Sequence, residues 1–177
     1  ATSSQTTFTG VDANGDTLWT RRLTSSLSST YNSVCSSDSG YLACAGVMSL
    51  LPSSSAADIL IVKYDSNGDT LWSKRIIDSI GYTAINMTPS DQNYMLSAWI
   101  AGTDEFCLIL IDSIGSVLWE NRITGDFVPL DVKRTGDGGY IVTGYTHNFN
   151  GIHEVFTIKT DVSGNQQWIK NYGEGKG

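Results

Sequence analysis

An all-β fold of repeated four-stranded sheets is predicted by three features of this 177-residue sequence. Eighteen glycines, only three prolines, five tryptophans and eight tyrosines suit many short strands joined by tight turns. The apolar residues lie in short runs without helical periodicity. One motif that combines a turn with a tryptophan occurs four times, so the chain is a repeat protein.

The motif is D-x-x-G-x-x-x-W, and successive tryptophans are separated by 53, 47 and 49 residues. This spacing is typical of β-propeller blades. Aspartate bonds to its own backbone and glycine accepts a positive φ, so each motif predicts a hairpin turn. Packing between neighbouring blades is the expected role of the tryptophans. The shared positions are Asp12, Gly15 and Trp19; Asp65, Gly68 and Trp72; Asp112, Gly115 and Trp119; and Asp161, Gly164 and Trp168.

Each repeat is expected to contain four strands. A second turn, at 38–41, 91–94 and 137–140, separates the first two strands. An apolar run opened by an acidic residue forms the third, at 58–64, 105–111 and 154–160. The tryptophan strand is the fourth, at 70–76, 117–123 and 166–172.

Only two strands, 8–11 and 17–23, precede the first full repeat, so the count is about fourteen strands or three and a half blades. The repeats are expected at 1–23, 24–76, 77–123 and 124–177 of a single propeller region. Part of a longer propeller is the favoured interpretation. A ring that tolerates an incomplete blade, or an assembly whose open edges a partner chain covers, are the alternatives.

Charge and composition exclude several classes of partner. The net charge is −7 with eleven lysines and arginines, so nucleic acid and anionic membranes are not expected partners. No apolar stretch is long enough for a membrane-spanning helix, and insertion into a membrane is not expected. The polar start at residues 1–7 is interpreted as a chain from which any export signal has been removed.

No catalytic or metal-binding set is expected. Cys35, Cys44 and Cys107 lack metal-type spacing and are interpreted as buried residues, although a disulfide between Cys35 and Cys44 stays open. His147 and His153, beside Glu154, could hold a metal or act as an acid/base couple, but exposed loop histidines are favoured. The acidic turns that begin at residues 12 and 65 lack the glutamate that closes a calcium loop. No cofactor is therefore expected.

The connections after the second and fourth strands vary in length and composition, and variable loops on a repeated scaffold are where recognition can differ. They comprise 23–31, 46–58, 99–105, 123–130 and 145–154. Aromatic and polar residues in or near them suit a protein partner or a carbohydrate, and the sequence does not separate the two. The candidate ligand or partner residues are Tyr31, Tyr82, Trp99, Asp104, Phe127, His147, Asn148 and Phe149.

The clearest motif copies run from Lys63 to Lys74 and from Thr135 to Tyr145. They follow K-x-D-x-x-G-D-T-x-W-x-K and S-D-G-G-Y-I-V-x-G-Y, and the likeness covers nearly the whole chain. The chain thereby resembles a large group of secreted bacterial β-propeller repeats and, more distantly, the tryptophan-docking motif of quinoprotein propellers. Ser116 and Asn165 replace the aspartate after the motif glycine, so the shared positions are structural more than chemical.

This resemblance implies an exported or cell-surface bacterial protein. We expect a non-enzymatic scaffold for binding or adhesion, with a protein or the remaining blades of a larger chain as partner. The alternative is a structural subunit that assembles through open blade edges, because an unclosed sheet presents unpaired backbone groups. An enzyme that acts on glycans or uses a quinone is the third hypothesis.

Overall fold

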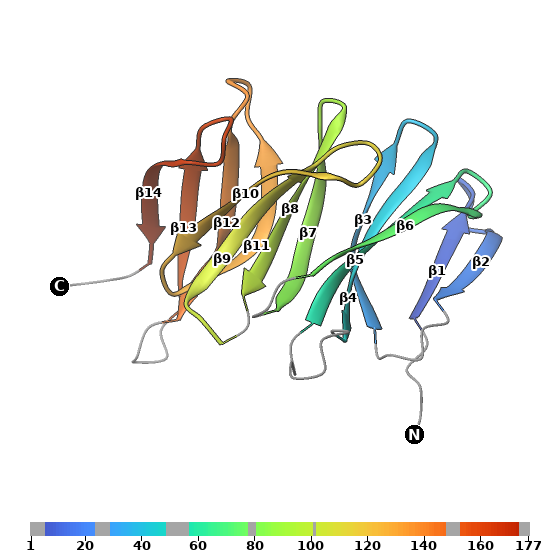
Figure 1. Ribbon diagram of the computed structural model, residues 1–177, viewed down its shortest axis with the longest axis horizontal. Coiled ribbons are helices and arrows are strands. Elements are labelled where there is room, and N and C mark those ends of the chain that lie inside the picture. The colour runs from blue at the N-terminus through green and yellow to red at the C-terminus, as the bar shows by residue number, and fades with distance from the viewer. Residues whose placement is uncertain are drawn as a thin grey trace. The chain divides into compact units, whose positions relative to one another are not determined.

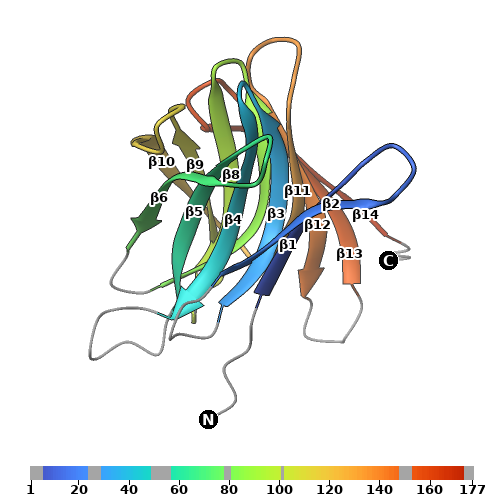
Figure 2. The same ribbon diagram turned by 90° about the vertical axis from the view of Figure 1, so that its right-hand side faces the viewer.

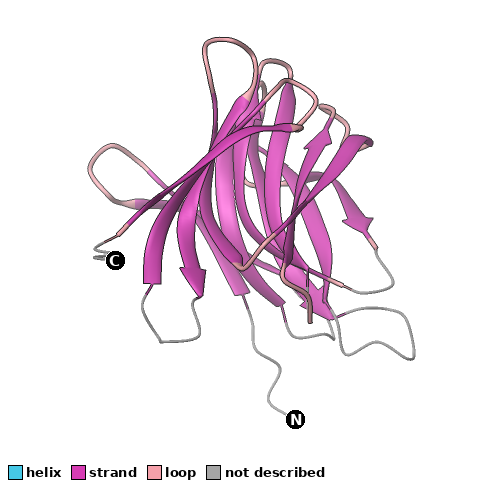
Figure 3. Ribbon diagram, turned by 90° about the vertical axis from the view of Figure 1, so that its left-hand side faces the viewer, coloured by secondary structure: helices cyan, strands magenta, loops and turns pink. Residues whose placement is uncertain are grey.

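The structure, a computed structural model, describes residues 6–23, 29–48, 57–77, 81–100, 102–147 and 153–173. Every regular element in these ranges is a strand, and none is a helix (Figure 3). The strands are β1 Thr6–Val11, β2 Thr17–Leu23, β3 Ser29–Ser37, β4 Gly40–Met48, β5 Ala57–Asp65, β6 Thr70–Ile76, β7 Tyr82–Ser90, β8 Asn93–Ile100, β9 Glu105–Ile111, β10 Val117–Thr124, β11 Phe127–Arg134, β12 Tyr140–His147, β13 His153–Thr160 and β14 Gln166–Tyr172.

Strands that follow one another in the sequence pair side by side. The described part of the chain forms three four-stranded sheets, β3 to β6, β7 to β10 and β11 to β14, and one two-stranded sheet of β1 and β2 (Figure 1). A four-stranded sheet of this order is the blade of a propeller. The predicted all-β class with three and a half propeller-like blades is therefore confirmed.

The chain divides into two compact units, and the division falls inside β7. Unit 1 is Ala1–Ala84 and contains the β1–β2 hairpin and the sheet β3 to β6. Unit 2 is Ile85–Gly177 and contains most of the sheet β7 to β10 and the whole sheet β11 to β14. Each unit thus contains one junction between successive blades.

The four D-x-x-G segments fold as the sequence predicts. In the first copy, the Asp12 carboxylate accepts hydrogen bonds from the backbone N–H groups of Asn14 and Asp16, at 2.8 and 2.9 Å. Gly15 takes a φ of +88° and its N–H donates to the Asp12 carbonyl. The same bonds recur at Asp65, Asp112 and Asp161. The aspartate is therefore a turn-forming residue, and backbone donation lowers the pKa of the Asp12 carboxyl.

Two of the motif glycines, Gly68 and Gly164, have a second role at the junction inside their unit. A Cβ on Gly68 would lie 2.5 Å from the Trp19 ring, and one on Gly164 would lie 2.7 Å from the Trp119 ring. The tryptophan of one blade therefore packs directly on the turn of the next blade. In unit 1 the Trp19 indole N–H also donates to the Ser66 carbonyl at 3.0 Å.

The third strand of a blade is covered on both faces, whereas the fourth is largely exposed. Seven consecutive residues of β5 are buried, but β14 contains only one residue that is not exposed. This explains why the third strands read as continuous apolar runs in the sequence. The acids that open these runs bond within their own blade: Asp58 is buried and pairs with Arg75 at 3.1 Å, and Glu105 accepts from Thr124 at 3.1 Å.

The three cysteines are free. Cys35 pairs across the β3–β4 ladder with Leu42, while Cys44 lies two pairs away opposite Ser33. The two thiols that the sequence leaves open for a disulfide are thus not directly opposite each other. Burial, with a smaller contribution from the nearby Cys35, raises the pKa of the Cys44 thiol to about 12, so Cys44 behaves as a buried apolar residue.

Candidate functional site

A cavity of about 290 Å³ opens in unit 2, where β8 ends and β11 begins. It brings together three residues that the sequence analysis proposed for a ligand face, Trp99, Asp104 and Phe127. Thr103, Asp126 and Val128 complete the lining. Its volume is close to the lower limit of about 300 Å³ for small-molecule sites, so it suits one sugar ring or one large side chain.

Trp99 is the one exposed residue of β8 and lies next to the end of the strand. Its neighbours Ala98 and Ile100 are buried, whereas Trp99 is 36% exposed. It pairs across the β8–β9 ladder with Phe106, whose ring is buried in the core. The strand therefore holds an indole ring at the surface on a rigid base.

Hydrogen bonds fix the two turns that flank the cavity. The Thr103 hydroxyl donates to the Ile100 carbonyl at 3.0 Å and accepts from the Glu105 N–H at 3.2 Å. The Gly125 N–H donates to the Asp104 carbonyl at 2.8 Å, which ties the turn before β9 to the turn before β11. The Asp104 side chain is thereby positioned from its backbone.

Phe127 connects the cavity to the core of unit 2. Its ring centroid lies 4.8 Å from that of Phe156 and 6.4 Å from that of Phe106. Gly125 has a φ of +147°, and a Cβ there would lie 2.1 Å from the Phe127 ring. Only glycine lets the turn pass this close to the ring, so Gly125 is a positioning residue for the cavity.

The cavity is acidic and partly aromatic. Asp104 and Asp126 are both exposed, and the lining that the structure describes contains no lysine, arginine or histidine. Carboxylates accept hydrogen bonds from hydroxyl and amine groups, and the face of an indole ring binds apolar C–H groups or a cation. The site therefore favours neutral or positively charged ligands over anionic ones.

Of the remaining predicted face residues, only Tyr82 has a described side chain. Tyr82 is only 1% exposed, so its assignment to the ligand face is wrong and it belongs to the core. Tyr31 lies in β3 and His147 at the end of β12, where its backbone pairs with that of His153, but their side chains are outside the description. Asn148 and Phe149 lie outside the described residues.

Three lining residues were missed by the sequence analysis as individual candidates. Thr103, Asp126 and Val128 fall within the variable connections 99–105 and 123–130, which the analysis did single out. A stronger signal was available in the Gly-Asp pair at residues 125 and 126, because it marks a tight turn beside a predicted aromatic residue.

Among the described residues, no three histidine, cysteine, aspartate or glutamate side chains are grouped so as to hold a metal ion. The described part of the chain also contains no helix that could cross a membrane.

No protein-family model matches the chain, and no curated protein matches it. Among solved structures it is similar to one described as the crystal structure of the eukaryotic initiation factor, with 9% identity and a TM-score of 0.48. That match covers 81% of this chain and 32% of the other, so this chain spans about a third of its length. It is also similar to a protein of unknown function from Bacteroides caccae, with 12% identity, a TM-score of 0.37 and coverage of 96% and 94%.

Proposed function

We propose that the chain is a non-enzymatic binding scaffold and that the cavity of Trp99, Asp104 and Phe127 is its recognition site. The convergence of these three residues in one cavity carries the proposal. The scaffold is rigid at this point, since Phe127 is packed on the core and the turns beside Asp104 are joined by a backbone hydrogen bond.

A neutral carbohydrate is the ligand class that suits this lining best. The apolar face of a sugar ring would stack on Trp99, while its hydroxyl groups would donate to the carboxylates of Asp104 and Asp126. The volume of about 290 Å³ admits one sugar unit, so a longer glycan would extend beyond the cavity.

Glycan-array binding with the whole chain tests this proposal. We expect binding to neutral glycans without product formation, and a loss of at least tenfold in affinity for Trp99→Ala. Trp168→Ala is the matched control, because Trp168 is 40% exposed and does not line the cavity. Equal binding by Trp99→Ala and the parent chain, or turnover of a bound glycan, would contradict the proposal.

A location at the bacterial cell surface is the cellular context that we propose, on the likeness of the D-x-x-G-D-T-x-W and S-D-G-G-Y repeats to secreted bacterial propellers. Fractionation of the source cells, with an antibody against residues 57–77, tests it. Recovery of the protein only from the cytoplasm would contradict this context.

Assembly through an open blade edge is a second candidate function. One observation favours it: in unit 1, β1 has β2 on one side and no strand on the other among the residues that the structure describes. The intact mass of the protein from its source, measured with its size in solution, tests this function. A mass of 19.2 kDa in a larger particle would support assembly, and a larger intact mass would indicate further blades in one chain.

A further inference from the structure

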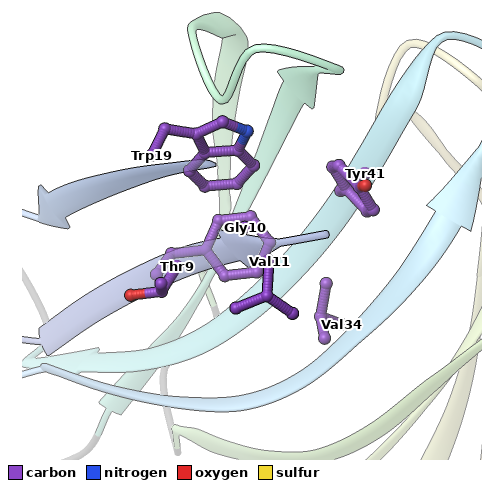
Figure 4. Close-up of a pocket in the computed structure, with 7 residues that line it drawn as sticks. Thr9, Gly10, Val11, Trp19, Val34 and Tyr41 are labelled. Atoms are coloured by element: carbon purple, nitrogen blue, oxygen red, sulfur yellow. The ribbon is translucent and has the colours of Figure 1, made fainter. Parts of the chain in front are cut away.

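A second cavity, of about 290 Å³, lies beside β1 in unit 1, and its lining is mostly apolar. Figure 4 shows Trp19, Val11, Val34 and Tyr41 gathered around the end of β1. Three of these side chains are unusually exposed for apolar residues: Val11 is 56% exposed, Val34 51% and Tyr41 38%. Phe8, Thr9 and Gly10 complete the lining. We call this set the β1 surface.

Unit 2 contains the same arrangement in a covered form. Tyr41 is the second residue of β4 and Tyr140 the first of β12, each at the start of the second strand of a blade. Each ring lies 6.1 Å from a motif tryptophan, Trp19 or Trp119. Yet Tyr140 is only 2% exposed, and its hydroxyl is hydrogen-bonded to that of Ser90 in β7 at 2.8 Å.

The other two exposed residues also have buried counterparts. Val34 and Val132 occupy equivalent positions, because each lies two residues before the residue that pairs with the blade's tyrosine across the ladder. Val132 is buried in the core of unit 2 together with Met95 of β8. Val11 and Ile111 each precede a motif aspartate, and Ile111 is buried. All three positions are therefore covered in unit 2 and uncovered in unit 1.

Two strands account for the difference. In unit 2, β8 pairs with β9, and β11 packs against β8 and β9. In unit 1, β1 is the counterpart of β9 and β3 the counterpart of β11, and these two strands are in contact (Figure 2). No described strand in unit 1 takes the places of β7 and β8.

We propose that the β1 surface binds an antiparallel β-hairpin, whose second strand adds to β1 as β8 adds to β9. The partner is defined by its chemistry. Its first strand ends in a hydroxyl residue opposite Tyr41, as Ser90 does for Tyr140. Its second strand carries an apolar side chain that packs with Val34, since Met95 and Val132 belong to one buried cluster in unit 2. Backbone pairing supplies affinity and the two side chains supply specificity. This inference rests on the second candidate function, assembly through the open edge, and not on the cavity of Trp99.

A second copy of the chain is the weaker occupant. Pairing of β1 with β1 of another copy would extend the sheet, but it would bring no counterpart of β7 and therefore none of Ser90. A hairpin of two strands fits the two missing positions, and a hairpin is marginally stable until it packs on a sheet.

The test appends a second copy of residues 81–100, the β7–β8 hairpin, to the N-terminus of the full chain. Residues 1–5 then join the added hairpin to β1, much as residues 101–104 join β8 to β9. We expect amide hydrogen exchange in β1 to slow by at least tenfold and the added hairpin to resist protease. Met95→Glu in the added copy alone is the matched control, because a charge would face the apolar β1 surface; it should abolish the protection.

Three outcomes would overturn the proposal. The first is unchanged hydrogen exchange in β1, and the second is equal protection by the Met95→Glu copy. The third is protection of β1 in the parent chain that rises with protein concentration, because it would indicate a second copy as occupant. The size of the parent chain in solution distinguishes failure of hairpin binding from failure of assembly through the open edge. If the parent assembles but the added hairpin does not bind, the hairpin fails and assembly stands; if neither occurs, both fail.

Discussion

The two blade junctions, one in each unit, use the same residue types and bury them to different extents. In both, a motif tryptophan packs on the glycine of the next D-x-x-G turn and contacts a tyrosine at the start of the blade's second strand, Tyr41 or Tyr140. That tyrosine is 38% exposed in unit 1 and 2% exposed in unit 2. The tryptophan and glycine therefore suffice for one part of a junction, while the rest requires the first two strands of the preceding blade.

The largest expected difference between the junctions is in the free energy of unfolding that each unit loses when its motif tryptophan is replaced by alanine. Trp119→Ala should lower the free energy of unfolding of unit 2 by about 3 kcal/mol, because a large ring is removed from a junction that is closed on its other side. Trp19→Ala should cost unit 1 roughly half as much, since the neighbouring Tyr41 can relax toward solvent. Calorimetry, which resolves separate transitions, measures both. Equal losses would show that β7 and β8 add nothing to the junction.

A smaller effect sharpens the comparison to one hydroxyl group. Tyr140→Phe should destabilise unit 2 by about 1 kcal/mol, because it removes a buried hydrogen bond and leaves Ser90 without that partner. Tyr41→Phe should change the stability of unit 1 by less than about 0.5 kcal/mol, since the position is exposed. Urea denaturation of the two variants measures this. In the chain with the appended hairpin, Tyr41→Phe should become as costly as Tyr140→Phe.

The smallest effect is a dependence on acid that the two units share. Hydrogen bonds from Thr135 and Lys159 hold the pKa of the Asp137 carboxyl well below its usual range, and Lys63 lowers the pKa of Asp38. A carboxyl whose pKa is lower in the folded chain stabilises it above the unfolded value of about 3.9 and loses this contribution as pH falls further. When melting temperatures are measured between pH 2 and 7, they should decrease as the pH is lowered below about 4. The decrease should be less steep for Asp137→Asn. Identical slopes for the variant and the parent would contradict this.

Local chemistry made much of the fold predictable. The predicted tryptophan strands 17–23, 70–76 and 166–172 have the observed bounds, and the strand predicted at 117–123 ends one residue later. The reason is that each D-x-x-G turn is closed by its own aspartate and glycine. Such a turn sets where one strand ends and the next begins without help from the rest of the chain.

The candidate site was predictable only in part. Trp99, Asp104 and Phe127 were found because they stand in variable connections between strands. Tyr82 was assigned to the same face although it is buried. The sequence around the start of a strand does not indicate whether the side chain there faces solvent or the core. Thr103 and Asp126 were passed over, since a small polar residue in a turn reads first as a turn former.

The sequence by itself determined the repeat, the tryptophan strands, the turns and the four-stranded pattern of a blade, because all of these depend on residues within one blade or on their spacing. Only the tertiary structure decided which equivalent residues are covered. Burial of Tyr140 but not of Tyr41 depends on strands contributed by the preceding blade, and the cavity beside Trp99 depends on a hydrogen bond between Gly125 and Asp104 across two connections. Contacts between elements distant in the sequence leave no trace in local pattern, so packing alone distinguishes a closed junction from an open one.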